Sequence, residues 1–142
     1  MWYPSGNYFI SLGDKKVHKY VLRYAESRNG VDWPKEGLAV IRHANDDEYG
    51  FGRPYIVKQN GVFRLFYSIR TKSKGYRLGF AESVDGKSFD RRDSEIGIDV
   101  SLSGWDSEMQ CYSSLLDVNN KSYLFYNGNG LGDVGFGYAE AV

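Results

Sequence analysis

The sequence has little of several features that mark particular classes of protein. It holds one cysteine, so no disulfide can form within the chain, and a reducing, cytoplasmic location is expected. Eighteen basic residues balance eighteen acidic ones. This balance argues against nucleic acid or an anionic membrane as partner, because both select a basic excess. No apolar run reaches the length of a membrane span or a signal peptide.

The chain is also poor in metal-binding and reactive side chains. His18 and His43 have no second His or Cys at metal spacing, so neither a metal site nor a cofactor is predicted. Cys111 has no neighbouring His to activate it and is expected to be a buried thiol on an inner strand. Residues 43–50 (HANDDEYG) could gather a hard cation. A solvated loop is the favoured interpretation of that stretch.

Aromatic residues and glycines, in contrast, are abundant. The chain has twelve Tyr, eight Phe, three Trp and seventeen Gly, but only three Pro. This composition is typical of a β-rich protein with many turns. No segment keeps apolar residues at helical spacing for three turns. The predicted class is therefore all-β.

One phrase occurs three times. It is complete at residues 20–33 (YVLRYAESRNGVDW) and 76–89 (YRLGFAESVDGKSF), and short at 135–142 (GFGYAEAV). Each copy alternates large apolar with small or polar residues, which is the two-residue period of a half-buried strand. Stretches with paired aromatic residues precede the copies, at 1–5, 63–69 and 123–128.

Two further strands complete the repeating unit. They lie at residues 53–59 and 111–118, and the first is closed by the hairpin signal Asn60-Gly61. Four antiparallel strands, repeated along the chain, are typical of the blades of a β-propeller.

The predicted fold is thus a β-propeller fragment of about two and a half to three four-stranded blades. It forms one half-propeller domain over residues 1–142, with blade parts at 1–37, 51–93 and 108–142. Alone, such a fragment exposes blade faces and strand edges. We therefore expect a homodimer that closes a ring of about five or six blades.

Three stretches resemble the five-bladed propeller glycosidases, a superfamily that includes arabinanases, β-xylosidases, invertases and levansucrases. They are residues 53–68 (RPYIVKQNGVFRLFYS), 76–89 and 104–130 (GWDSEMQCYSSLLDVNNKSYLFYNGNG). The resemblance is closest to uncharacterised members, and the chain looks like a half-length relative of them. These residues belong to strands and turns, so they indicate the fold more strongly than an activity.

The resemblance implies a site at one end of an axial funnel, where three carboxylates rise from the innermost strands. Cleavage of a glycosidic bond needs two carboxyl groups with pKa values pushed apart. Glu108 lies about where the family keeps its acid and is the candidate catalytic residue. Arg53-Pro54 stands where a family member would show Asp before Pro, and the strand of the nucleophile is missing. Two of the three carboxylates are thus unaccounted for.

An oligosaccharide or sugar is the expected ligand, because aromatic faces stack on sugar rings while charged groups bind hydroxyls. Arg53 could hold a hydroxyl or a carboxylate, or pair with Glu108. The stretch YNGNG at 126–130 suits sugar hydroxyls or a plain turn. The predicted substrate-binding residues are Arg53, Trp105, Asp106, Tyr112, Asn127 and Asn129.

Glutamates recur in the repeated phrase as Glu26, Glu82 and Glu140. A residue present in every copy is expected to be structural, pairing across strands or capping a turn.

Two functional hypotheses follow. The first is a carbohydrate-binding or assembly module whose funnel is formed by the homodimer. The second is a glycoside hydrolase or transferase in which two-fold symmetry supplies two copies of Glu108. The first is favoured because the Asp before Pro54 is missing. A truncated relative without catalytic activity is the third possibility.

Overall fold

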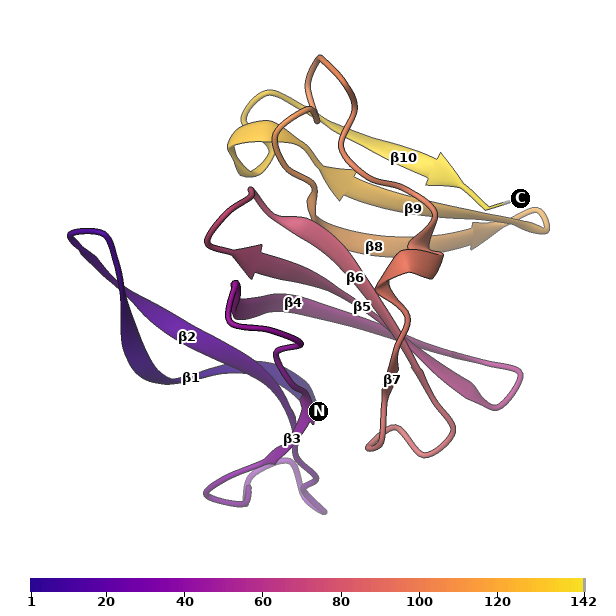
Figure 1. The fold of residues 1–142 in the computed structure, drawn as a ribbon. Helices are drawn as coiled ribbons and strands as arrows, with labels where there is room; N and C mark the ends of the chain where they lie inside the picture. Colours follow the sequence, from indigo (N-terminus) through magenta and orange to yellow (C-terminus); the bar gives the residue numbers. More distant parts are fainter. Residues whose placement is uncertain (142) are drawn as a thin grey trace.

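The computed structural model describes residues 1–141, apart from the side chain at position 7, and it is all-β, as predicted. Three antiparallel sheets lie side by side in chain order (Figure 1). The first contains β1 (Trp2–Leu12), β2 (Lys15–Tyr24) and β3 (Leu38–Ile41). The second contains β4 (Glu48–Gln59), β5 (Val62–Thr71), β6 (Arg77–Ser83) and β7 (Asp90–Arg91). The third contains β8 (Cys111–Val118), β9 (Lys121–Asn127) and β10 (Phe136–Glu140).

The strand order of the sheets is compatible with a propeller fragment. The sheets run β1-β2-β3, β4-β5-β6-β7 and β10-β9-β8, so a four-stranded sheet lies between two three-stranded ones. Two 3-10 helices, η1 (Asp93–Ile96) and η2 (Asn129–Gly132), lie in the connections. The outer strand β3 lies just beyond residue 37, where the first blade part was expected to end. Within the described residues, no helix has the length and apolar character needed to cross a bilayer.

The core lies in two layers, one on each face of the middle sheet. On β5, Leu65 and Tyr67 face the first sheet, where they pack with Leu22 and Ile41. Phe66, between them, faces the third sheet. Because β5 is buried on both faces, its sequence FRLFYSI reads as an almost continuous apolar run. Strand β4 packs against both β2 and β8, so it lies where the three sheets meet.

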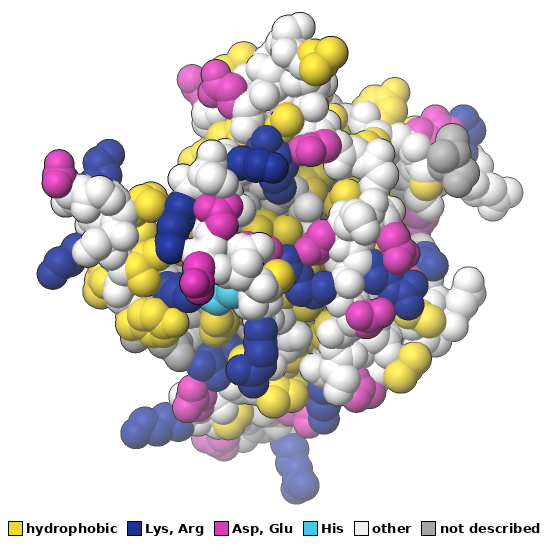
Figure 2. All heavy atoms as spheres, viewed as in Figure 1, with side chains coloured by type: hydrophobic (Ala, Val, Ile, Leu, Met, Phe, Trp, Pro, Cys, Tyr) yellow, Lys and Arg dark blue, Asp and Glu magenta, His cyan; other side chains and the backbone are white. Residues whose placement is uncertain are grey.

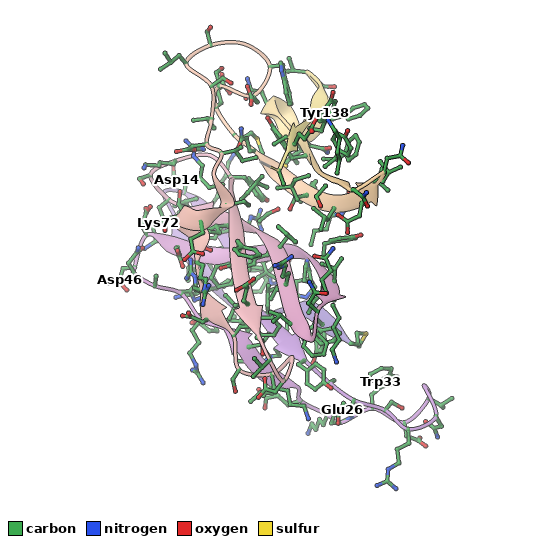
Figure 3. The ribbon with its side chains drawn as sticks, turned by 90° about the vertical axis from the view of Figure 1, so that its right-hand side faces the viewer. Asp14, Glu26, Trp33, Asp46, Lys72 and Tyr138 are labelled. Carbon is green, nitrogen blue, oxygen red and sulfur yellow. The ribbon has the colours of Figure 1, made fainter. Side chains whose placement is uncertain are left out.

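The connections between strands gather at two opposite ends of the molecule. Asp14 in the β1–β2 turn, Asp46 before β4 and Lys72 after β5 lie on one side, which we call the Asp46 end (Figure 3). Glu26 and Trp33, which follow β2, lie on the opposite side, the Trp33 end (Figure 3). The segment 104–110 before β8 meets the β5–β6 connection, since the amide of Gln110 donates to the carbonyl of Tyr76 at 2.9 Å. Strands β4 and β8 therefore both begin at the Asp46 end.

The repeated A-E-S phrase forms a turn at the Trp33 end. Ser83 Oγ accepts the amide of Gly86 at 2.9 Å, and Asp85 Oδ1 accepts the amides of Lys87 and Ser88 at 2.7 Å each. Ser27 and Asn29 make the corresponding bonds after β2; Ser27 Oγ accepts the amide of Gly30, while Asn29 Oδ1 accepts the amides of Val31 and Asp32. The phrase is thus a turn device of the fold.

The recurring glutamates form ion pairs, which agrees with the structural role expected for them. Glu82 lies opposite Arg64 on β5, and the Arg64 Nε to Glu82 Oε1 distance is 3.1 Å. Glu140 pairs with Lys121 at 2.6 Å. Glu26 pairs with Lys87 of the next sheet at 3.1 Å.

Cys111 is fully buried at the start of β8, and burial raises the pKa of its thiol to about 11. At pH 8 the reactive thiolate is therefore scarce and shielded. We expect iodoacetamide to modify the native protein at least about 100-fold more slowly than the urea-unfolded protein. Mass spectrometry of timed samples measures the two rates. Equal rates would show that Cys111 is accessible in the folded state.

Candidate functional site

The strands expected to be innermost, β4 and β8, carry a bulge at the same level. On β4, Gly52 pairs with Ser68 and Tyr55 with Phe66, so Arg53 and Pro54 have no partner on β5. On β8, the ladder is interrupted between Cys111 and Ser114 in the same way. Proline cannot donate to a ladder, which explains the interruption on β4. Bulges of this kind re-aim side chains and are common next to active sites.

Arg53 and Tyr112 occupy equivalent positions in the two bulges and meet there. Both have a left-handed backbone, with φ of 41° and 59° respectively. Such a conformation costs about 1–3 kcal/mol for a residue other than glycine and persists only where the surroundings enforce it. The Arg53 guanidinium lies 5.8 Å from the centre of the Tyr112 ring. The structure thus brings two of the predicted substrate-binding residues together.

A second arginine extends this contact across the Asp46 end. The Arg70 guanidinium lies 5.2–5.7 Å from the ring centres of three tyrosines, Tyr20, Tyr49 and Tyr76. The Tyr76 ring in turn lies 6.1 Å from that of Tyr112. We call this group the arginine–tyrosine cluster; its members are Tyr20, Tyr49, Arg53, Arg70, Tyr76 and Tyr112.

The sequence pointed to only two members of the cluster, Arg53 and Tyr112. Tyr20 and Arg70 lie on β2 and β5, which were expected to supply core and turn residues only. A signal was present for Arg70, because it is a charged residue directly after the buried run FYSI. The role of Arg70 depends on which side chains face it from the neighbouring sheet, and the sequence alone does not show them.

The cluster carries positive charge that no acidic residue balances. In the part of the chain that the structure describes, no carboxylate lies within ion-pairing distance of Arg53 or Arg70. The Nε of Arg70 is buried and has no hydrogen-bond partner among the described residues. Burial raises the pKa of Tyr76 to about 12, so its hydroxyl stays protonated. The cluster thus offers cations, neutral hydroxyls and aromatic faces.

Three other predicted residues hold the segment 104–110 in place. Asp106 is buried and accepts hydrogen bonds from Gln110 Nε2 at 2.9 Å and from the Tyr126 hydroxyl at 3.2 Å. Burial raises the pKa of Asp106, but hydrogen bonds from Ser101, Gln110 and Tyr126 outweigh it and bring the pKa below its usual value. Trp105 stacks on Tyr126 with ring centres 5.4 Å apart.

Asn129 completes this support. Its Oδ1 accepts the amides of Glu108 and Met109 at 2.8 and 3.2 Å, and its Nδ2 donates to the carbonyl of Gly104 at 3.0 Å. Asn127 Nδ2 donates to the carbonyl of Leu131 at 2.9 Å. Both polar atoms of the Asn129 side chain and the Nδ2 of Asn127 are therefore engaged within the protein.

Glu108, the candidate catalytic residue, lies at the Asp46 end with an exposed side chain. Its carbonyl accepts a hydrogen bond from Arg77 Nη1 at 3.0 Å and lies against Gly75. The alternative pairing of Glu108 with Arg53 is not formed, since none of the ion pairs among the described residues joins them.

The solvated loop expected at residues 43–50 is only partly correct, because Glu48 already begins β4 and is buried. A buried ion network lies where this loop joins β4. Arg91 donates to both Glu48 oxygens at 2.8 Å each, and its Nη2 also donates to Asp93 Oδ2 at 2.5 Å. The Tyr67 hydroxyl donates to the other Asp93 oxygen at 2.6 Å. Burial raises the pKa of Glu48, but the Arg91 guanidinium outweighs it and lowers the pKa overall. No group of three metal-ligating side chains occurs among the described residues.

A cleft of 670 Å³ lies outside the cluster, between this loop and the segment 93–99. Carboxylates line it, but they are committed to other partners. Asp93 is held by Arg91 and Tyr67, and Asp99 pairs with Arg77 at 2.8 Å. Asp47 accepts hydrogen bonds from Ser73 at 2.7 and 2.9 Å.

The strained backbone at Arg53 gives a stability prediction. Replacing Arg53 with glycine should leave the free energy of unfolding unchanged or raise it by up to about 1 kcal/mol, because glycine adopts positive φ freely. The control is Arg64→Gly on the regular strand β5, expected to cost about 1–2 kcal/mol through lost strand propensity and the lost pair with Glu82. Urea denaturation measures both. An equal loss in the two variants would show that Arg53 is not strained.

Known proteins resemble this chain both in sequence and in fold. No protein-family model matches the chain. Two proteins of Mycobacterium tuberculosis are similar to it over 139 residues. Uncharacterized protein Rv1502 (strain ATCC 25618 / H37Rv) is 37% identical and Uncharacterized protein MT1551 (strain CDC 1551 / Oshkosh) is 36% identical. The matches cover 98% of this chain but 45% of each relative, so the chain spans about half the length of the curated relatives it matches.

Two solved structures match the chain with a TM-score of 0.67 and 21% identity. One is described as a glycoside hydrolase and the other as a BT0996 RGII complex. Each match covers 99% of this protein and 39% of the solved one. The chain therefore has the fold of part of a glycoside hydrolase, which is what its sequence resemblance to the propeller glycosidases implied.

Proposed function

We propose that the protein binds carbohydrate at the arginine–tyrosine cluster. The observation that carries the proposal is the meeting of Arg53 and Tyr112 on two bulged strands that begin at the same end of the molecule. Strained, equivalent positions on neighbouring strands are typical of functional sites. Tyrosine rings stack on the C–H faces of sugar rings, and arginine donates to sugar oxygens. One structural neighbour is described as a glycoside hydrolase, which supports a glycan as the ligand.

Binding is favoured over hydrolysis by the placement of the carboxylates. Hydrolysis by the usual route takes two carboxyl groups on either side of the scissile bond. The acidic groups of the 670 Å³ cleft are committed to ion pairs and hydrogen bonds. The Glu108 side chain forms no ion pair with any described residue. The alternative is a hydrolase whose site is built across a dimer from two copies of Glu108. The variant Glu108→Gln distinguishes the two functions. It should abolish hydrolysis if the protein is a hydrolase, but it should alter only the affinity for glycan if the protein is a binding module.

The proposal includes a homodimer that completes the funnel. Large apolar side chains are exposed on both flanks, Tyr8 and Phe9 on β1 and Phe136 and Tyr138 on β10. In Figure 2 hydrophobic side chains gather over the β1–β2 hairpin, at the left of the view. A second copy is the proposed occupant of these flanks, since it would bring the same exposed apolar side chains to them. Light scattering across a dilution series should give twice the mass of 16.2 kDa; a monomer at all concentrations contradicts the dimer.

The binding proposal is tested by replacing Tyr112 with alanine. The variant should weaken binding of the best glycan in a mixed panel of neutral and acidic oligosaccharides by about tenfold or more. The matched control is Trp33→Ala, an exposed aromatic residue at the opposite end, which should leave the affinity unchanged. Calorimetric titration measures both. An equal effect of the two variants, or no glycan bound by the wild-type protein, contradicts the proposal.

A further inference from the structure

We infer that the arginine–tyrosine cluster recognises a carboxylate, so that the glycan it binds contains a uronic acid. This inference rests on the proposed function and concerns the chemistry of the ligand at the same site. It starts from the two arginines, because Arg53 lies over one tyrosine ring and Arg70 over three, while neither forms an ion pair among the described residues.

Two other arginines near the Asp46 end, Arg77 and Arg91, have acidic partners, whereas the exposed Arg42 has no ion pair among the described residues. Arg77 pairs with Asp99 at 2.8 Å, and Arg91 is shared between Glu48 and Asp93. Arg53 and Arg70 depart from this pattern in the described part of the chain. Arg53 is exposed, but Arg70 is half-buried, and a guanidinium that is partly withdrawn from water without a counter-ion carries an unfavourable desolvation cost. A ligand anion would remove that cost.

Arg70 also has an unpaired hydrogen-bond donor in its guanidinium group. Three tyrosine rings pack around it, and its Nε is buried without a hydrogen-bond acceptor among the described residues. Buried donors are rarely left unpaired in native proteins. The tyrosines fix the guanidinium in place, so little side-chain entropy is lost when an anion binds.

A carboxylate on a sugar ring fits this arrangement better than a spherical anion. Arginine presents parallel N–H donors that match the two oxygens of a planar carboxylate. The rings of Tyr76 and Tyr112 lie between the two arginines, since Arg70 is over Tyr76 and Arg53 is over Tyr112. A sugar ring stacked there would reach a guanidinium on either side.

The strained backbone at Arg53 adds independent support. The left-handed conformation costs free energy and is retained at a position where the side chain is exposed. A glycine would serve the bulge as well if the side chain had no task. The strain at Arg53 therefore supports a task for its exposed side chain.

The experiment compares tri-galacturonate with its methyl ester, which has the same sugar rings but no charge. Wild-type protein should bind the acid about 10- to 100-fold more tightly than the ester. Arg53→Met and Arg70→Met should each bring the affinity for the acid close to that for the ester. Arg70→Lys keeps the charge but loses the paired donors, and it should restore only part of the preference. Arg28→Met is the charge-matched control, in the exposed turn at the Trp33 end, and should retain the preference.

The possible results distinguish recognition of a carboxylate from carbohydrate binding in general. Equal affinity for acid and ester, with binding still lost in Tyr112→Ala, overturns the inference but preserves carbohydrate binding at the cluster. Loss of the preference in Arg28→Met as well would assign it to net charge and also overturn the inference. A sulfated trisaccharide that binds as tightly as tri-galacturonate would show recognition of any oxyanion instead of a carboxylate. Circular dichroism of each variant confirms that a lost affinity is not a lost fold.

Discussion

Replacing Arg91 with methionine is expected to lower the free energy of unfolding by about 3–5 kcal/mol. The Arg91 guanidinium is the shared partner of Glu48 and Asp93, and the Glu48 side chain is only 8% exposed. The substitution leaves two carboxylates facing each other in a partly buried place without a counter-ion. Breaking a buried ion pair costs more than the pair contributes, because the remaining charge cannot be solvated.

The control for this prediction is the next residue along the chain. Arg92 also forms ion pairs, with Asp90, Glu82 and Glu95, but its side chain is 40% exposed. Arg92→Met should therefore cost less than about 1 kcal/mol. Urea denaturation of both variants gives the comparison. Equal losses would mean that the Glu48–Arg91–Asp93 network does not stabilise the fold beyond an ordinary surface pair.

Replacing Gly79 with alanine is expected to lower the free energy of unfolding by about 3 kcal/mol. A Cβ at this position of β6 would lie 2.3 Å from Cε2 of Tyr67. The Tyr67 ring has no room to retreat, because it is fully buried and its hydroxyl is bonded to Asp93 at 2.6 Å. The strand must therefore shift, which disturbs the core between the first two sheets.

Gly52 provides the matched control for Gly79. A Cβ there would meet nothing within 4 Å. Gly52→Ala should leave the stability within about 1 kcal/mol of the wild-type value. Thermal unfolding followed by circular dichroism ranks the two variants. A Gly79→Ala protein as stable as Gly52→Ala would show that the Tyr67 ring can move.

The fold was predictable because its signals are local. The alternation in YRLGFAES and the turn chemistry of Ser83 and Asp85 act within a few residues, so both can be recognised in the sequence. The position of β3 was harder to predict from the sequence. Several residues lie between the Gly30 turn and Leu38, and no local sequence signal shows at which of them the strand begins.

The candidate site was only partly predictable, for a physical reason. Trp105, Asp106 and Asn129 have the composition of a sugar site, but their polar groups and rings are used to hold one segment together. Sequence shows which groups could bind a ligand, not which of them are already satisfied by the protein. Arg70 illustrates the converse, since its three tyrosine neighbours come from separate parts of the chain.

The central claim is that sugar binds at the arginine–tyrosine cluster, and an NMR titration tests it most directly. Amide chemical shifts would be followed as the best-binding oligosaccharide is added to the wild-type protein. We predict that the largest changes fall at Arg53, Arg70, Tyr76 and Tyr112, all at the Asp46 end. Changes confined to the cleft lined by Asp47 and Asp99, or to the turn at Trp33, would place the ligand elsewhere and contradict the claim.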